Sequence, residues 1–173
     1  MPKNLPDPEN LEAWLEVVDD ESMAQTAIRN EKCPVKAMEK AIQKFPNLDG
    51  QVVYNSATPS HILENVYNRA GWGGTRSTIV EHKNVTDKIL KLAASDPDEY
   101  VRSKVAERTS NSTTLELLSK DNSDSVRFNV ARNPNSTPAI LENVLDPYKQ
   151  NIAAGVIANP NCTPLLFELI AKR

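Results

Sequence analysis

The side chains that most often carry catalysis or bind metals are few in this chain and stand apart from one another. His61 and His82 are the two histidines, and neither has a cysteine at the spacing of a zinc site. Cys33 and Cys162 are far apart in the sequence, so they suggest neither a disulfide framework nor a metal cluster. We therefore expect no metal site and two cysteines that are buried as small apolar side chains.

Hydroxyl groups and glycines give no better indication of an active site. A nucleophilic serine or cysteine would need a histidine and an acid nearby, whereas the serines and threonines here stand at expected helix starts, where capping explains them. No glycine-rich phosphate loop occurs. The sequence predicts no catalytic residue and no cofactor, and a protein that is not an enzyme.

Arginines recur at a fixed position of the chain. Arg76, Arg102 and Arg127 each stand three residues before an apolar residue that recurs about every 26 residues. In packed helices such a row would have a spacing of about 10 Å and could bind an acidic partner. Acids such as Asp96 and Asp121 recur just upstream, so ion pairs between repeats explain the row more simply.

Other exposed positions complete a candidate binding surface. The residue two places after each recurring apolar residue varies between repeats, as in a recognition surface or by drift of exposed positions. Trp72, flanked by glycines, is either an exposed anchor for a partner or a ring folded back over a helix. These variable residues are Arg29, Tyr54, Glu81, Glu107, Arg132 and Ala158. The candidate binding surface is Arg76, Arg102, Arg127, Arg132, Tyr54 and Trp72.

An internal repeat defines the elements that position these side chains. The segments 130–138 and 156–164 match at six of nine places without a gap. The first residue of each belongs to a series of apolar residues with a period of about 26 residues, which we call the anchors. The anchors are Ala27, Val52, Ile79, Val105, Val130 and Val156. They predict an all-α, right-handed helical-repeat solenoid of about six repeats.

Each repeat is expected to contain two helices. The first, around the anchor, spans about five to seven residues and is short enough to adopt 3₁₀ geometry. It ends at an asparagine, the non-glycine residue that best tolerates the left-handed conformation; these are Asn30, Asn55, Asn133 and Asn159. The second helix, of about three turns, starts at Thr-Pro. These starts are Thr58-Pro59, Thr137-Pro138 and Thr163-Pro164, whereas Thr86-Asp87 and the run 112–114 leave the register open by one residue.

The two ends differ from the interior. Pro8 begins a helix with Leu11, Trp14 and Leu15, so residues 1–22 are expected to form a capping half-repeat before repeats in 23–173. The last helix, 164–173, is rich in apolar residues and lacks a C-terminal cap, which would allow a homodimer through this helix. The whole chain, 1–173, is expected to be a single helical-repeat domain.

The repeat resembles a known family. The pattern Val-Arg-x-x-Val-Ala-x-Asn-Pro-x-x-Thr-Pro, followed by a leucine-rich helix and an Asp-rich turn, is best developed at 126–146 and 151–171 and resembles the leucine-rich repeat variant family. The resemblance implies alternating 3₁₀ and α-helices in a right-handed superhelix without strands. Some members are similar but carry an N-terminal cysteine cluster for an iron–sulfur centre, and residues 1–32 here contain no cysteine.

Composition and charge restrict the functions. Hydrophobic residues make up 39% and charged residues 25% of the chain, which is ordinary for a soluble globular protein. No run of eighteen apolar residues and no secretory signal occurs, so we expect no membrane association and a cytoplasmic location. Residues 1–25 hold seven acids and one base, which leaves 26–173 with a charge of about +3, well short of that of a duplex-binding domain.

The sequence therefore predicts a noncatalytic scaffold that binds a protein partner, whose identity the sequence does not give. The alternative is a nucleic-acid-binding repeat protein that uses a basic concave face. Under this alternative, the face would consist of Arg76, Arg102, Arg127, Arg132 and Lys104.

Overall fold

The computed structural model describes residues 5–146 and 149–172, which form thirteen α-helices, one 3₁₀ helix and no strand. The expected all-α class is confirmed. Contacts divide the chain into two compact units, Met1–Val85 (unit 1) and Thr86–Arg173 (unit 2). Residues 1–4 of the expected N-terminal cap and Arg173 of the expected last helix lie outside the described residues.

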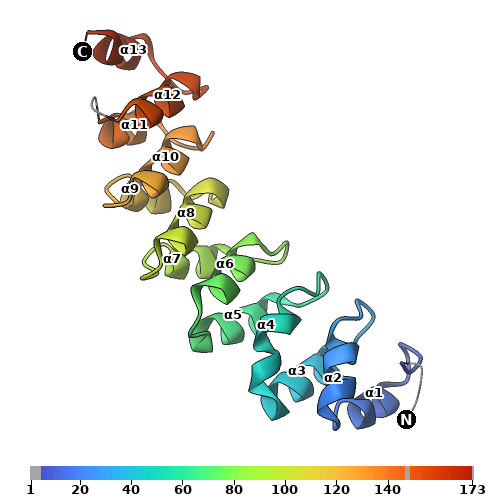
Figure 1. Ribbon diagram of the computed structural model, residues 1–173. Helices are drawn as coiled ribbons and strands as arrows, with labels where there is room; N and C mark the ends of the chain where they lie inside the picture. The colour runs from blue at the N-terminus through green and yellow to red at the C-terminus, as the bar shows by residue number, and fades with distance from the viewer. Residues whose placement is uncertain (1–4, 147–148, 173) are drawn as a thin grey trace. The chain divides into compact units, whose positions relative to one another are not determined.

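Unit 1 contains six α-helices and the 3₁₀ helix η1 among its described residues, and Figure 1 shows them joined by short turns. α1 packs against α2 and α3, and α2 packs against α3 and α4. The elements are α1 (Leu11–Val17), α2 (Glu21–Ile28), α3 (Val35–Lys44), η1 (Pro46–Leu48), α4 (Asp49–Val52), α5 (Ser60–Arg69) and α6 (Gly73–Glu81).

Unit 2 has two rows of helices. α10 packs on one side against α8 and on the other against α12, and α9 packs against α11 in the second row (Figure 1). The helices are α7 (Asp87–Ala93), α8 (Glu99–Arg108), α9 (Ser112–Leu118), α10 (Asp124–Arg132), α11 (Pro138–Val144), α12 (Gln150–Ala158) and α13 (Pro164–Ala171).

The anchors form the centre of each unit. All six are fully buried, and so are four of the residues that stand one helical turn before them, namely Leu48, Val101, Val126 and Ile152. An i, i+4 pair of this kind lies on one face of a helix, and this face is the one that each helix turns inward. The expected core is therefore confirmed at the anchors.

The expected lengths of the helices were wrong. The anchor-bearing helices are α-helices of 8–10 residues except for the four-residue α4, and η1 is the one 3₁₀ segment of the described chain. The reason lies upstream of the anchors. Asp20 and Asp98 each accept a hydrogen bond from a backbone N–H group in the first turn of the helix that follows, which starts the helix two residues before its core pair.

A buried asparagine joins successive turns in unit 2. Asn133 Nδ2 donates to the carbonyl oxygens of Ala106 and Thr109 at 2.8 and 2.9 Å, and its Oδ1 accepts from the N–H of Asn135. Asn159 repeats the arrangement one period later, with Nδ2 donating to the carbonyl oxygens of Ala131 and Asn133 at 2.7 and 2.8 Å. Each asparagine therefore fixes its own turn and ties it to the preceding turn. We call such a residue a rung.

Unit 1 has the same ladder with one substitution. Asn55 Nδ2 donates to the carbonyl oxygens of Ile28 and Asn30. His82 is the next rung, with Nε2 lying 2.9 Å from the carbonyl oxygen of Asn55 and Nδ1 accepting from the N–H of Asn84. An imidazole can replace the amide because its two nitrogens can supply one donor and one acceptor.

The conformation expected of these asparagines was wrong. No described residue has a positive φ, and Asn133 and Asn159 are extended, with φ of −67° and −75°. A left-handed residue would reverse the chain at once, whereas the extended conformation lets the amide reach the carbonyl groups of the preceding turn. Asparagine is present for its side-chain hydrogen bonds rather than for its backbone tolerance.

The helix starts also correct the alignment of the repeats. Thr137 and Thr163 cap α11 and α13 as expected, but the hydroxyl of Thr58 donates to the carbonyl oxygen of Val52 and caps no helix. Ser136 makes the equivalent bond to Val130. Thr58 therefore corresponds to Ser136 rather than to Thr137, which moves the Thr-Pro alignment of that repeat by one residue.

The structure defines where the second helix starts in the repeats that contain Thr86-Asp87 and the run 112–114. Thr86 Oγ1 accepts from the N–H of Ile89 at the start of α7. Asn111 Oδ1 accepts from the N–H of Thr114 at the start of α9. Both are ordinary N-caps, so the run 112–114 belongs to the helix.

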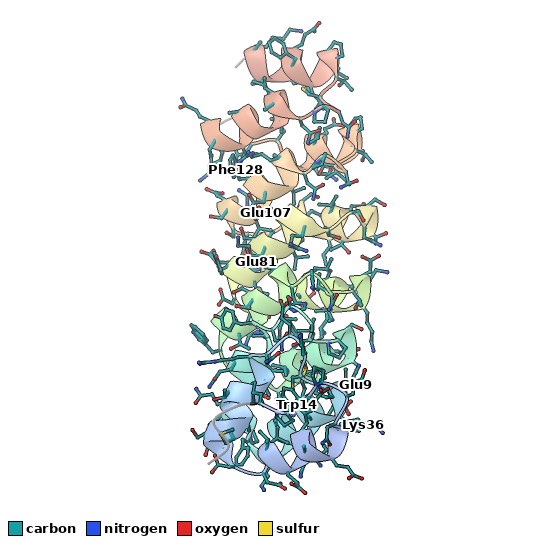
Figure 2. All side chains as sticks on the ribbon, turned by 90° about the vertical axis from the view of Figure 1, so that its right-hand side faces the viewer. Glu9, Trp14, Lys36, Glu81, Glu107 and Phe128 are labelled. Atoms are coloured by element: carbon teal, nitrogen blue, oxygen red, sulfur yellow. The ribbon has the colours of Figure 1, made fainter. Side chains whose placement is uncertain are left out.

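The N-terminal helix starts later than Pro8 predicts. α1 begins at Leu11, because Asn10 Oδ1 accepts from the N–H of Ala13 and caps it there. Trp14 is buried in unit 1, and its Nε1 donates to the carbonyl oxygen of Asp7 (Figure 2). The buried indole thus holds the segment before α1 against the unit.

The rungs predict a large stability cost for their removal. Asn133→Ala leaves two buried carbonyl oxygens without a donor, so we expect it to lower the free energy of unfolding by at least about 2 kcal/mol. Asn143→Ala, at an exposed position of α11, should change it by less than about 0.5 kcal/mol. Urea denaturation followed by circular dichroism measures both. Equal stability of the two variants would contradict the structural role of the rungs.

Candidate recognition surface

The variable positions after the anchors all lie at the surface. The six side chains, at positions 29, 54, 81, 107, 132 and 158, are exposed. Four of them, Tyr54, Glu81, Arg132 and Ala158, directly precede a rung that is held by hydrogen bonds in the interior. A changing set of exposed side chains therefore rests on a backbone of constant geometry.

A shallow hollow lies between two of these positions in unit 1. It has a volume of about 270 Å³ and is mostly apolar, with Tyr54 on one side and Glu81 on the other. The ring of Tyr54 is 72% exposed. The other lining residues are Val53, Ser56, Thr78, His82 and Lys83.

An equivalent hollow lies in unit 2, with a volume of about 340 Å³. Glu107 and Arg132 line it as Tyr54 and Glu81 line the first, and its floor includes the rung Asn133, as the first includes the rung His82. Figure 2 shows Glu107 on the same side of unit 2 as Phe128. The same place in the repeat is thus hollowed in both units, with different side chains around it.

Arg132 contacts an aromatic ring and has no acidic partner in the described part of the chain. Its guanidinium carbon lies 5.5 Å from the centre of the Phe128 ring, one helical turn earlier in α10. Gly155 of α12 lies against both side chains, because a Cβ added there would be 3.4 Å from Arg132 Cγ and 3.6 Å from Phe128 Cδ2. The closest approach of such a Cβ would be 3.1 Å, to Ala131 Cβ, so the glycine lets α12 pack closely on α10 beside the pair, which a cation–π attraction stabilises.

The other predicted arginines of unit 2 are bound within the protein. Arg102 forms a two-point pair with Asp121, at 2.7 and 3.0 Å, and Arg127 pairs with Asp124, which also binds Lys149 at 2.6 Å. Burial alone would raise the pKa of Asp121, but hydrogen bonds from Arg102 and from the Ser123 N–H lower it below its usual value.

All three arginines of the predicted row share a second bond. Each donates from Nη1 to the carbonyl oxygen six residues earlier, in the turn before its own helix: Arg76 to Ala70, Arg102 to Asp96 and Arg127 to Asp121. These bonds brace the turn against the helix. The Arg102–Asp121 pair joins neighbouring repeats, as the ion-pair explanation of the row expects, whereas the Arg127–Asp124 pair lies within one helix.

Trp72 combines the two alternatives that the sequence left open. Its ring is 71% exposed, yet it lies over the start of α6, because a Cβ at Gly74 would come within 2.4 Å of the ring. Gly74 thus provides the flat surface on which the indole rests. The ring is exposed and at the same time restricted, as in a preformed contact for a partner.

The remaining reactive side chains have structural roles. His61 Nε2 lies 2.8 Å from Glu39 at the surface of unit 1, and burial raises the pKa of the Cys33 thiol to about 12, so that it is an inert core residue. Cys162 is half-buried rather than buried as expected. The described residues contain no group of histidine, cysteine and acidic side chains that could hold a metal ion.

Arg132 was predicted from the sequence, but its neighbours Phe128 and Gly155 were not. Phe128 and Arg132 stand four residues apart, a spacing that places them on one helical face, so the pair itself was detectable. The role of Gly155 was not detectable, since it depends on the packing of α12 against α10.

Comparison of the chain with protein-family models, with curated proteins and with solved structures finds no match. None of the described helices has both the length and the apolar character that crossing a bilayer requires.

The contact of Trp72 with Gly74 leads to one prediction. In Gly74→Ala the new methyl group displaces the indole, so time-resolved fluorescence anisotropy should show faster local motion of the exposed tryptophan. Gly71→Ala, with open space at its Cβ, should leave the motion unchanged. Because alanine favours a helix over glycine by about 1 kcal/mol, the variant should remain folded. Unchanged ring motion in Gly74→Ala would contradict the contact.

The Arg102–Asp121 pair leads to another. Asp121 has a lowered pKa in the folded protein, so its contribution to stability is present above its ordinary value of 3.8 and is lost as the pH falls through the folded value. Asp121→Asn should therefore be less stable than the wild type at pH 7, and the difference should shrink below about pH 4. Urea denaturation over this range measures the effect. Glu116→Gln, at an exposed position of α9, is the control, and a pH-independent difference for Asp121→Asn would count against the pair.

Proposed function

We propose that the protein is a noncatalytic scaffold, a right-handed solenoid of about six helical repeats that binds a segment of a partner protein in the hollows between its variable side chains. The observation that carries the proposal is the recurrence of a hollow at the same place of the repeat, bordered by Tyr54 and Glu81 in unit 1 and by Glu107 and Arg132 in unit 2. Repeat proteins commonly bind partners in this way, with side chains that vary on a regular backbone.

Two further features favour a protein partner. Tyr54 and Trp72 are the most exposed of the large hydrophobic side chains in the described chain, and tyrosine, tryptophan and arginine are the residues enriched at the energetic centres of interfaces. The resemblance to the leucine-rich repeat variant family agrees with such a scaffold. A cytoplasmic location remains part of the proposal.

The nucleic-acid alternative is less favoured. It requires arginines that are free to neutralise phosphates, whereas the guanidinium groups of Arg102 and Arg127 are bonded to carboxylates and to backbone carbonyl groups. Arg132 shares its hollow with Glu107, whose charge would repel a polyanion. Mixed charge of this kind suits a peptide better than a nucleic acid.

Panning of a displayed random-peptide library on the whole chain tests the proposal. We expect enriched peptides whose affinity, measured by fluorescence anisotropy, falls about tenfold on Tyr54→Ala or on Arg132→Ala, as for an interface residue worth more than 1 kcal/mol. Tyr100→Ala removes another exposed tyrosine, 54% exposed, at the end of α8 opposite to Glu107 and should have no effect.

Two results would overturn the proposal. One is the absence of any enriched peptide, or affinities that neither hollow variant changes. The other is binding of labelled single- or double-stranded DNA or RNA at physiological salt, with an affinity that falls steeply as salt rises.

The homodimer through α13 stays a separate proposal. Leu165 and Phe167 are 67% and 53% exposed, and an apolar helix face of this kind can pair with its own copy about a two-fold axis.

A further inference from the structure

The unit 2 hollow is lined by one arginine, Arg132, that has no hydrogen-bond or ion-pair partner among the described residues. Asn133 Nδ2 is bonded to Ala106 and Thr109, and Asn129 Nδ2 is bonded to the hydroxyl and carbonyl oxygens of Ser103. The carbonyl oxygen of Pro134 accepts from Asn161. Among the described lining residues this leaves the guanidinium of Arg132 as the donor that faces the hollow without a hydrogen-bond partner.

The position of Arg132 is prepared for a ligand. The Phe128 ring lies 5.5 Å from the guanidinium carbon and α12 packs beside the Arg132 stem at Gly155, so part of the side-chain entropy has been given up before binding. Arg102 on α8 and Arg127 on α10 already bind carboxylates of the protein. Arg132 has the same fork of donors, but no carboxylate of the described chain is bound to it.

We propose that Arg132 binds a carboxylate of the partner segment, an aspartate or glutamate side chain, in this hollow. The proposal rests on the proposed function and names the chemistry of one of its sites. A guanidinium and a carboxylate match in shape and can form two parallel hydrogen bonds. The hollow, of about 340 Å³, accommodates an acidic side chain and its backbone.

Glu107 makes a carboxylate more suitable than a phosphate. Glu107 lines the same hollow. Lys104 Nζ lies 3.5 Å from the Glu107 carboxylate, and the Glu107 side chain is 60% exposed. Lys104 therefore compensates the negative charge of Glu107 only in part. A singly charged ligand on Arg132 can keep its distance from Glu107. A phosphate with nearly two negative charges is repelled more strongly by the same carboxylate.

Two defined peptide libraries test this proposal, with random flanks around a fixed glutamate or a fixed glutamine. We expect the glutamate library to yield peptides that bind the whole chain, and Arg132→Gln to weaken them about tenfold or more. Arg29→Gln, at the equivalent position of the first repeat, should have no effect. The charge exchange, Arg132→Glu with lysine in place of the peptide glutamate, should restore binding.

The outcomes separate the two proposals. Peptides that bind equally well with glutamate or glutamine overturn the carboxylate site and leave the scaffold function standing, whereas the absence of any binding peptide in either library overturns both. A peptide with phosphoserine at the fixed position that binds more tightly than its glutamate counterpart overturns the choice of carboxylate. Circular dichroism of the variants confirms that the exposed substitutions leave the fold intact.

Discussion

The structure depends on a side-chain amide that is buried among backbone carbonyl groups. Where a helix ends, its last carbonyl groups have no partner within the helix, and burying them unpaired would cost free energy. In each unit the rungs Asn55, Asn133 and Asn159 supply the missing donors from the following turn. The Oδ1 atom of the same amide accepts a backbone N–H of its own turn. One asparagine therefore both fixes its own turn and pairs the carbonyl groups of the preceding one.

This division of tasks explains why the surface can vary. The anchors and the rungs fix the backbone from the interior, and the arginines at positions 102 and 127 brace the turns from the other end of the helices. The side chains of Tyr54, Glu107 and Arg132 take part in none of these rung and brace bonds. They are therefore available for recognition, and the proposed carboxylate site is one case of such use.

The sequence was informative where a pattern reflects a local rule. The i, i+4 apolar pairs identified the buried face of each anchor helix, and Thr137 and Thr163 marked true helix starts. It was misleading where one residue type has two uses. Asparagine was interpreted by its backbone tolerance although it acts through its amide, and Thr58 was interpreted as a cap although its hydroxyl binds Val52. The hollows and the role of Gly155 could not be predicted, because they arise from contacts between helices of different repeats.

The ladder has a direction. Every rung amide donates toward the preceding turn, from Asn55 to Asn30 in unit 1 and from Asn159 to Asn133 in unit 2. On the ribosome, the acceptors of each rung are therefore synthesised before the rung itself. During synthesis, folding generally proceeds from the N-terminal side. Within a unit, the carbonyl groups that a rung binds are therefore already present when the rung emerges.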